Sequence, residues 1–289
     1  MNNILVTGAT GLLGRSLIPR LREHGHKIIT QARIMDADFL VDVSDINNTF
    51  KLLEQVKPTV IINLIGLTSV ELCQEQTNAA YLANCRTVEN MVKWIKRSAS
   101  GCHLIQISTD HVYDGIGPHA EEIVNLTNNY AFSKYAGELA AALIPSTILR
   151  TNFIGLSHAP NRESLTDWVF DSIKNGESIK VLSDVFFSPL SMVNLSEMIN
   201  LVIEKKPIGI FNLGSRNGMS KADFDFSFAE CLGLQTKTMT RITTEQATFL
   251  EAYRPKDMRL DSSKFEKALG VILPSLSDEI QLVANDYLE

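Results

Sequence analysis

Short runs of Ile, Val and Leu alternate with amphipathic stretches through the first half of the chain. The apolar runs predict strands at Ile4–Thr7, Lys27–Thr30, Thr59–Leu64, His103–Ser108 and Ser146–Arg150. The stretches between them predict helices at Leu12–His24, Ile46–Gln55, Ala79–Arg97 and Tyr130–Leu143. Continuous apolar strands are typical of a parallel sheet covered on both faces, and strand–helix alternation favours right-handed crossovers. The pattern therefore predicts an α/β fold built on a doubly wound parallel sheet.

The regular alternation fades after Arg150, where the chain becomes richer in loops. Helices are predicted at Leu165–Asn175, Leu195–Ile203 and Leu276–Tyr287, and short strands at Ser178–Leu182 and Gly209–Leu213. This change of pattern predicts a smaller C-terminal lobe. The later strand-like segment predicts that the chain returns to the first domain over roughly residues 189–213.

Composition does not change the fold prediction, but it narrows the classes of binding partner. The 289 residues are 45 % hydrophobic and 21 % charged, as in an ordinary globular chain. There are 27 Lys and Arg against 33 Asp and Glu, so nucleic acid and anionic membranes are not expected partners. The N-terminal sequence lacks the charged region of a signal peptide, and no apolar run is long enough to span a bilayer, so a cytoplasmic protein is expected. Four separated Cys and six His without a ligand spacing predict no metal site.

The sequence Gly8-Ala-Thr-Gly11-Leu-Leu-Gly14 follows the first predicted strand and opens the first predicted helix. Gly8 permits a tight turn, Gly11 lets a pyrophosphate approach the backbone, and Gly14 lets the helix pack close to the strand. The helix N-terminus then offers free N–H groups to the phosphates. A purely structural turn is the alternative, but this context favours a Rossmann-type dinucleotide-binding domain over residues 1–150. The cofactor contacts predicted along the turn are Gly8, Thr10, Gly11, Leu12, Leu13 and Gly14.

The end of the second predicted strand bears on which dinucleotide binds. An Asp or Glu there normally holds the ribose 2′-hydroxyl of NAD, whereas Thr30-Gln31-Ala32-Arg33 contains no acid. Arg33 is suited to the 2′-phosphate of NADP, and a solvated surface arginine is the alternative. NADP(H) is therefore the preferred cofactor and NAD(H) the alternative. Further cofactor contacts are predicted at Asp42 and Val43, near the adenine, and at Asn63 and Gly66, near the inner phosphate and ribose.

Tyr130-Ala-Phe-Ser-Lys134 is the only Tyr-x-x-x-Lys sequence in the chain, and it opens a predicted helix. Two residues four apart share one helix face. A phenol has an ordinary pKa of about 10, so Tyr130 needs a nearby ammonium group, here Lys134, to exchange protons at neutral pH. Thr109 closes a strand at the edge where open α/β sheets bind ligands, and its hydroxyl is suited to a substrate oxygen. Thr109, Tyr130 and Lys134 are thus the candidate catalytic residues; a buried Tyr beside a surface Lys is the alternative.

Six segments together form a pattern that covers most of the chain. They are the Gly8–Gly14 turn, Asn63-Leu-Ile-Gly-Leu-Thr68, Ser108-Thr-Asp-His-Val-Tyr-Asp-Gly115, Tyr130-Ala-Phe-Ser-Lys-Tyr-Ala-Gly-Glu138, Leu149-Arg150-Thr151 and Arg254-Pro-Lys-Asp-Met-Arg-Leu-Asp-Ser-Ser-Lys264. This set resembles the extended short-chain dehydrogenase/reductases, and most of all their dTDP-4-dehydrorhamnose reductase branch. The resemblance implies that Thr109, Tyr130 and Lys134 are catalytic, that the last two also hold the cofactor, and that residues 151–289 are mainly a substrate-binding lobe for a nucleotide sugar.

The sequence departs from that branch at positions expected to bear on the sugar. His111 stands where the branch usually has Tyr, and Asn152-Phe153 stands where it has aromatic residues. Val185-Phe-Phe-Ser-Pro-Leu190 replaces a Gln-x-Gly-x-Pro-Thr segment. His111 is interpretable as a substrate ligand, as a second proton donor or as a partly exposed residue that fills the volume of the Tyr. The predicted substrate-binding residues are Thr68, His111, Asn152 and Arg254.

Three functions are compatible with the sequence. The preferred one is NADPH-dependent reduction of a keto group on a nucleotide-activated deoxysugar, for the synthesis of surface-polysaccharide precursors. A nucleotide-sugar epimerase is the second, although tightly held NAD normally uses the acid that the second strand lacks. The third is a non-catalytic NADP-binding regulatory subunit, similar to that of methionine adenosyltransferase, which the intact trio does not exclude. The expected partners are a nucleotide-sugar substrate and, as an open alternative, a second copy of the chain in a homodimer.

Overall fold

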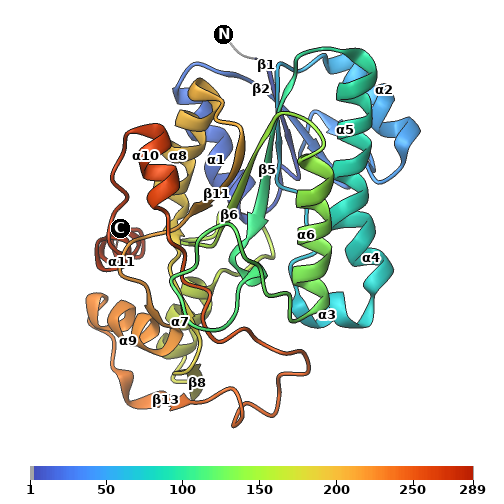
Figure 1. Cartoon of the computed structure of the whole chain (residues 1–289). Coiled ribbons are helices and arrows are strands. Elements are labelled where there is room, and N and C mark those ends of the chain that lie inside the picture. Colours follow the sequence, from blue (N-terminus) through green and yellow to red (C-terminus); the bar gives the residue numbers. More distant parts are fainter. Residues whose placement is uncertain (1–2, 289) are drawn as a thin grey trace. The chain divides into compact units, whose positions relative to one another are not determined.

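A computed structural model describes residues 3–288, and the chain forms two compact units (Figure 1). Unit 1 comprises the chain up to Thr109, then Asn128–Arg150 and Ser196–Phe211. Unit 2 comprises the remaining segments, Asp110–Thr127, Thr151–Leu195 and the chain from Asn212 onward. In the part of the chain that the structure describes, no helix combines the length and the apolar character needed to cross a bilayer.

A seven-stranded sheet forms the centre of unit 1, in the order β11-β6-β5-β4-β1-β2-β3. Its strands are β1 (Asn3–Thr7), β2 (Lys27–Ala32), β3 (Phe39–Leu40), β4 (Val60–Asn63), β5 (His103–Thr109), β6 (Ser146–Thr151) and β11 (Gly209–Leu213). β1 pairs in parallel with both β2 and β4, and β4 pairs in parallel with β5. The chain order reverses between β1 and β4, which is the switch point where such sheets bind ligands. The predicted doubly wound Rossmann-type sheet is confirmed.

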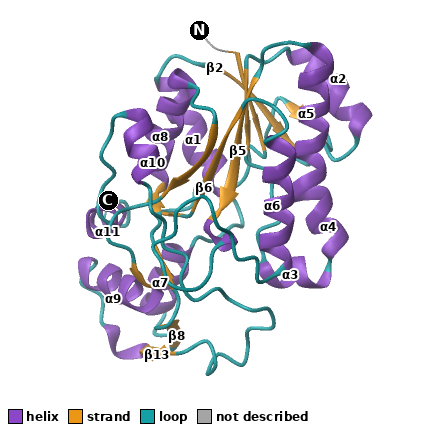
Figure 2. Ribbon diagram, in the orientation of Figure 1, coloured by secondary structure: helices purple, strands orange, loops and turns teal. Residues whose placement is uncertain are grey.

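Helices cover both faces of this sheet (Figure 2). The helices that belong wholly or mainly to unit 1 are α1 (Leu12–Glu23), α2 (Ile46–Val56), α3 (Val70–Glu75), α4 (Thr77–Tyr81), α5 (Thr87–Ser98), α6 (Asn129–Ala141) and α8 (Met192–Lys205). α2, α5 and α6 gather on one face, and α1 and α8 lie on the other (Figure 1). His26 Nε2 lies 2.8 Å from Asn200 Oδ1, which joins the end of α1 to α8.

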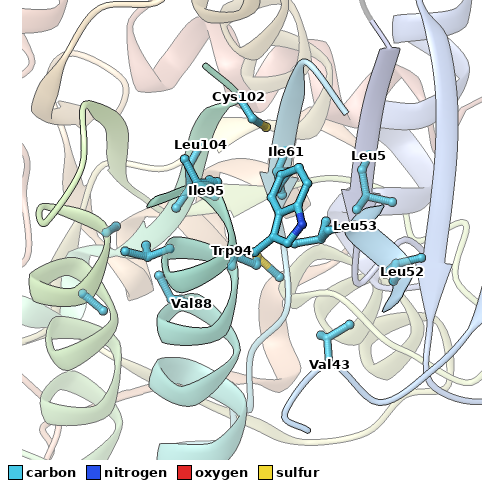
Figure 3. Close-up of a cluster of buried hydrophobic side chains, with 14 of the residues drawn as sticks. Leu5, Val43, Leu52, Leu53, Ile61, Val88, Trp94, Ile95, Cys102 and Leu104 are labelled. Atoms are coloured by element: carbon cyan, nitrogen blue, oxygen red, sulfur yellow. The ribbon is translucent and has the colours of Figure 1, made fainter. Parts of the chain in front are cut away.

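The core of unit 1 lies between its sheet and the helices α2 and α5 (Figure 3). Trp94 of α5 is 2 % exposed and packs in a cluster with Leu53 of α2, Ile61 of β4 and Leu104 of β5. Its indole N–H donates to Glu54 Oε1 at 2.9 Å, so the only polar atom of the ring is satisfied. The strands read as unbroken apolar runs because both of their faces are buried in this way.

Unit 2 consists of short elements around an aromatic core. Its helices are α7 (Leu165–Lys174), α9 (Lys221–Cys231), α10 (Ser263–Leu269) and α11 (Leu276–Asn285). Its strands form three pairs: β7 (Phe153–Ile154) with β10 (Leu190–Ser191), β9 (Phe186–Phe187) with β12 (Met219–Ser220), and β8 (Ile179–Leu182) with β13 (Met239–Ile242). Phe187 meets Phe224 edge to face, with ring centroids 5.4 Å apart. The helices of this unit bury one face against that core.

Residues 110–127 belong to unit 2, although the division at residue 150 places them in the first domain. Hydrogen bonds explain the difference, because the Gly117 N–H donates to Asp257 Oδ2 at 2.9 Å and the Tyr113 hydroxyl donates to Asn212 Oδ1 at 2.8 Å. Both partners are far away in the sequence and both lie in unit 2. The assignment of the two units to cofactor and substrate stays a prediction.

Candidate active site

The glycine turn connects β1 to α1 in unit 1. Gly8 has a φ of +70°, and a Cβ there would lie 2.9 Å from the backbone nitrogen of Ile65. A Cβ at Gly14 would lie 2.4 Å from the Ala9 carbonyl oxygen. These two positions therefore require glycine for the turn itself and for the close packing of α1.

Gly11 is different, because the fold does not fill the space around it. A Cβ there would meet only the Gly8 carbonyl oxygen within 4 Å, at 3.4 Å. Gly11 is also the N-cap of α1, no side chain caps its N–H groups, and the first turn holds no acidic residue. The turn thus leaves an open backbone cradle and a free helix N-terminus, an arrangement that suits a diphosphate.

We expect Gly11→Val to abolish dinucleotide binding while the fold survives. The branched side chain would occupy the space that the pyrophosphate needs, and within the fold it meets little else. Affinity is measured by fluorescence titration with NADPH, and folding by circular dichroism. A Gly11→Val protein with normal NADPH affinity would show that the turn is purely structural.

The loop after β2 holds charged residues that the sequence analysis missed. Arg33, predicted at the 2′-phosphate, is exposed immediately after β2. Asp38 folds back so that its Oδ2 accepts from the Thr30 N–H and hydroxyl at 2.9 and 2.8 Å, and these bonds lower the pKa of Asp38. Arg15, the residue after Gly14, donates to Asp36 Oδ2 at 2.7 Å. The loop therefore holds two acids that the strand end lacks, and both already have partners within unit 1.

Arg15, Asp36 and Asp38 line a cavity of about 310 Å³ within unit 1, whereas Arg33 is not among its lining residues. Its walls come from the glycine turn, from the outer side of α1 and from the loop between β2 and β3. The lining residues are Ala9, Gly14, Arg15, Ile18, Pro19, Arg22, Thr30, Asp36, Ala37 and Asp38. The cavity places Arg15 beside the turn, as a second cation that could meet a 2′-phosphate.

The remaining predicted cofactor residues differ in how far their side chains are exposed or already hydrogen-bonded within the fold. Asp42 is exposed, whereas Val43 is 2 % exposed and packs in the core. The Asn63 side chain is fully used inside the sheet, because its Oδ1 accepts from Thr7 Oγ1 at 2.7 Å and its Nδ2 donates to Gln106 Oε1 at 2.8 Å. Asn63 therefore ties β1, β4 and β5 together, and any contact it makes with a cofactor would come from its backbone.

The candidate catalytic residues lie together in unit 1. Thr109 ends β5, and Tyr130 and Lys134 lie one turn apart on α6. Each is less than 9 % exposed. Lys134 donates from Nζ to the Ile107 carbonyl oxygen at 2.7 Å, which fixes the ammonium beside the end of β5. A Cβ at Gly66 would lie 3.8 Å from Lys134 Nζ, so the structure also brings the predicted cofactor loop to the catalytic helix.

Burial controls the charge of Lys134. It lowers the pKa of Lys134 to about 8, and the negative charge of Glu138 opposes part of that shift. The ammonium form still predominates at pH 7, so Lys134 can stabilise the phenolate of Tyr130. Glu138 in turn is held by Arg150, whose guanidinium nitrogen lies 2.7 Å from Glu138 Oε2, and by the Ser108 hydroxyl at 2.5 Å. Glu138 and Arg150 are each 1 % exposed.

A residue that the sequence analysis missed, Asn84, connects the loop after β4 to α6. The predicted helix Ala79–Arg97 is interrupted by a π-helical turn, Leu82–Arg86, that carries Asn84 at its centre. Asn84 Oδ1 accepts from the Leu67 N–H at 2.8 Å, and its Nδ2 donates to Ser133 Oγ at 2.8 Å. Such π-turns are common at functional sites. The apolar periodicity hides this turn, and an Asn at an inward position was the only signal.

The predicted substrate residues are divided between the units. Thr68 is exposed in unit 1, whereas His111, Asn152 and Arg254 belong to unit 2. Asn152 Nδ2 donates to Asp110 Oδ2 at 2.8 Å. Burial and the charges of Lys221 and Arg254 lower the pKa of His111 to about 3, so its imidazole is neutral at pH 7. That charge state argues against His111 as a cationic proton donor.

Asp225 of α9, in unit 2, is expected to make stability depend on pH. It is 2 % exposed, and burial raises its pKa to about 7 from an ordinary value near 4. Between pH 4 and pH 7 the folded chain keeps a proton that the unfolded chain releases, so stability falls as the pH rises through this range. We expect the free energy of unfolding of Asp225→Asn not to fall in this range. Its stability relative to wild type should therefore rise by about 2–4 kcal/mol between pH 4 and pH 8. Urea unfolding at both pH values measures it.

Glu230→Gln, an exposed carboxylate on the same helix, is the control for Asp225→Asn. It should leave the difference in unfolding free energy between the two pH values unchanged. An Asp225→Asn protein with the wild-type pH dependence would show that Asp225 is ionised in the folded state throughout.

Known proteins similar to this chain share most of its length. A family model described as RmlD substrate binding domain matches residues 1–289. A dTDP-4-dehydrorhamnose reductase of Aggregatibacter actinomycetemcomitans is 28 % identical, with 94 % of each chain covered. Methionine adenosyltransferase 2 subunit beta of Pongo abelii is 26 % identical over 93 % of this chain and 82 % of its own. The crystal structure of a dTDP-4-dehydrorhamnose reductase from Clostridium acetobutylicum superposes with a TM-score of 0.89 at 26 % identity, with 99 % of each chain covered.

Proposed function

This chain belongs to the family of the RmlD substrate binding domain, and from that premise we propose that it reduces a keto group on a nucleotide-activated deoxysugar with NADPH. The family match confirms the resemblance found in the sequence. The observation that carries the proposal is the placement of Tyr130 and Lys134 on one helix, with Thr109 at the end of β5, in the unit that also holds the open glycine turn. Surface-polysaccharide precursors are the product class that the related reductases suggest.

The residues of unit 1 account for the chemistry of such a reduction. NADPH bound at the glycine turn would supply a hydride to the carbonyl carbon. The carbonyl oxygen then becomes an alkoxide that needs a proton within hydrogen-bond reach. Tyr130 donates that proton, the ammonium of Lys134 stabilises the resulting phenolate, and the Thr109 hydroxyl orients the oxygen. Gly11, Gly14 and the N–H groups at the start of α1 would hold the diphosphate.

The proposed activity is tested with a panel of keto-sugar nucleotides. Each is incubated with the protein and NADPH, and the nicotinamide absorbance is followed with time. Loss of absorbance with one member identifies the reaction class and the substrate together. No loss with any member, in a protein that binds NADPH, would leave the regulatory alternative as the better explanation.

The similarity to methionine adenosyltransferase 2 subunit beta gives that second candidate its support. A regulatory subunit would bind NADP and a partner protein without turning over a substrate. The two functions make opposite predictions for the same assay, because only the reductase oxidises NADPH. The epimerase interpretation loses its main objection, since Asp36 and Asp38 supply acids near the end of β2. Both carboxylates, however, already have partners within the loop and α1.

Arg33 is expected to favour NADPH over NADH. A charge-assisted hydrogen bond to the 2′-phosphate is worth roughly 1–3 kcal/mol, so NADPH should bind that much more tightly than NADH. Arg33→Ala should remove this preference and leave NADH affinity almost unchanged. The measurement is a titration of both cofactors against each protein.

Arg15→Ala distinguishes Arg33 from Arg15 of α1, the other arginine that could bind the 2′-phosphate. Arg15 is paired with Asp36 beside the glycine turn, so it could take the 2′-phosphate in place of Asp36. Loss of the NADPH preference in Arg15→Ala but not in Arg33→Ala would move the assignment to Arg15. Equal losses for both cofactors in Arg33→Ala would mean that Arg33 holds the loop rather than the phosphate.

A further inference from the structure

Glu138 is a buried carboxylate of unit 1 that the reduction chemistry described above does not use. Tyr130, Lys134 and Glu138 follow one another at intervals of four residues along α6, so they lie along one side of the helix. Glu138 is 1 % exposed, whereas glutamate side chains are seldom fully buried unless they are paired. A charge at this depth acts strongly on its neighbours, because little water screens it.

Four hydrogen bonds fix Glu138 as a carboxylate. Arg150 of β6 donates from Nε to both carboxylate oxygens at 3.1 Å, and from Nη2 to Oε2 at 2.7 Å. The Ser108 hydroxyl donates to Oε1 at 2.5 Å. Both oxygens of Glu138 thus act as acceptors, which is how an ionised carboxylate bonds, and bidentate contacts with arginine hold such a group in one orientation. Glu138 is therefore a fixed negative charge.

The end of β5 holds Glu138 and Lys134 at neighbouring residues. Lys134 Nζ donates to the Ile107 carbonyl oxygen at 2.7 Å, and Ile107 directly precedes Ser108, which binds Glu138. The next residue of the strand, Thr109, is the candidate ligand of the substrate oxygen. Two anchors on one strand and a spacing of four residues on one helix therefore make the ammonium and the carboxylate neighbours.

Apart from Glu138 and its arginine partner, the groups of unit 1 that the structure describes around Lys134 are uncharged at neutral pH. Cys73 of α3 acts on Lys134, but burial raises the pKa of its thiol to about 11, so the thiol stays protonated. The loop after β4 approaches through Gly66, where a Cβ would lie 3.8 Å from Lys134 Nζ, and none of that loop's residues is ionisable. Tyr130 is a neutral phenol until it gives up its proton. Glu138 thus supplies the negative charge that opposes the lowering of the Lys134 pKa by burial.

We propose that Glu138 is a positioning residue of the reaction which, held by Arg150 and Ser108, keeps Lys134 in its ammonium form beside Tyr130. The proposal rests on the proposed function, because it takes Tyr130 as the proton donor. Removing the charge of Glu138 should lower the pKa of Lys134 from about 8, so the ammonium would be lost at a lower pH. Reduction should then also fail at a lower pH, because a neutral amine does not stabilise the phenolate.

The charge of Lys134 is measured directly in Glu138→Gln, which keeps the shape of the side chain. Protein labelled with ¹³C at the lysine Cε is titrated by NMR, and Lys134→Met identifies the resonance that belongs to Lys134. Its midpoint in Glu138→Gln should lie at a pH about one lower than in wild type, the effect of one nearby opposite charge. Glu75→Gln is the matched control, because it removes an exposed carboxylate from α3, a helix that packs against α6, and it should leave the midpoint unchanged.

The pH dependence of turnover distinguishes this role from a purely structural one. Glu138→Gln should turn over about fivefold more slowly than wild type at pH 8 but at almost the wild-type rate at pH 6, where Lys134 is charged in both proteins. A structural defect would lower turnover by the same factor at both pH values. Glu138→Gln combined with Arg150→Met repeats the measurement without a buried arginine that has lost this carboxylate. Both shifts should keep their direction there, because the charge that acts on Lys134 is that of Glu138.

Two results would overturn the proposal. One is a Lys134 resonance that titrates at the wild-type pH in both Glu138 variants, and the other is a loss of turnover by the same factor at pH 6 and pH 8. If the keto-sugar panel gives no turnover, the NMR titration still decides whether Glu138 keeps Lys134 charged. A lower midpoint in Glu138→Gln together with an inactive wild-type protein would reject the reductase and retain the role of Glu138.

Discussion

Replacing Tyr130 with phenylalanine should lower turnover by about 10²–10⁴-fold while NADPH affinity persists. The variant keeps the ring, which is only 8 % exposed, and removes the hydroxyl that donates the proton. Without that donor the alkoxide has to take its proton from water. Turnover is measured with the keto-sugar that the panel identifies, and affinity by titration with NADPH.

Companion variants on the same elements make the result specific to Tyr130. Tyr135→Phe, on the same helix outside the catalytic trio, should turn over at the wild-type rate. Lys134→Met should lower both turnover and cofactor affinity, because its ammonium serves the phenol and the nicotinamide ribose. Thr109→Val should chiefly lower turnover. A Tyr130→Phe protein that reduces its substrate at the wild-type rate would move the proton donor to another group.

Breaking the buried ion pair of unit 1 should have the largest effect on stability. Arg150→Met leaves the Glu138 carboxylate 1 % exposed without its main cation, with the Ser108 hydroxyl still donating to it and the Lys134 ammonium still acting on it. Removing one partner of a buried pair typically costs about 3–5 kcal/mol. Urea unfolding measures the loss. Arg241→Met is the control, because the Arg241–Asp223 pair has the same 2.7 Å separation but is nearly half exposed, and it should lose less than about 1 kcal/mol.

A second variant separates the charge of Glu138 from its packing. Glu138→Gln combined with Arg150→Met removes both charges of the pair and should recover much of the lost stability. If Arg150→Met unfolds at the wild-type urea concentration, water must reach Glu138 in solution. If the double variant is no more stable than Arg150→Met, the loss comes from packing rather than from an unpaired charge.

The sequence predicted the elements whose pattern is local and repeated. Ile4–Thr7 and His103–Ser108 differ from β1 and β5 by one residue at an end, because an unbroken apolar run marks a strand that is buried on both faces. The two-residue strands of unit 2, such as β9 and β12, carry no period at all, so no pattern could predict them. The π-turn at Leu82–Arg86 escaped for a related reason, since one extra residue shifts the helical period without breaking the apolar face.

The residues of the candidate site also divide into those that a local sequence pattern predicts and those that it does not. The glycine turn and Tyr130-x-x-x-Lys134 are contiguous, so their chemistry can be read directly from the sequence. Asp38 reaches the end of β2 only because a loop folds back, and Asn84 meets Leu67 and Ser133 only through the tertiary structure of unit 1. Residues that act by long-range proximity leave no spacing to detect. Asp38 and Asn84 were missed on that ground.

The side-chain amide of Asn84 makes two neighbouring parts of unit 1 order together. One amide holds the backbone of Leu67 in the loop after β4 and the hydroxyl of Ser133 on α6, between Tyr130 and Lys134. We therefore expect that fixing either the loop or α6 reduces the conformational freedom that remains to the other. We expect a ligand that binds against this loop to offset part of the entropy of ordering α6, so that ligand binding and the alignment of Tyr130 are coupled.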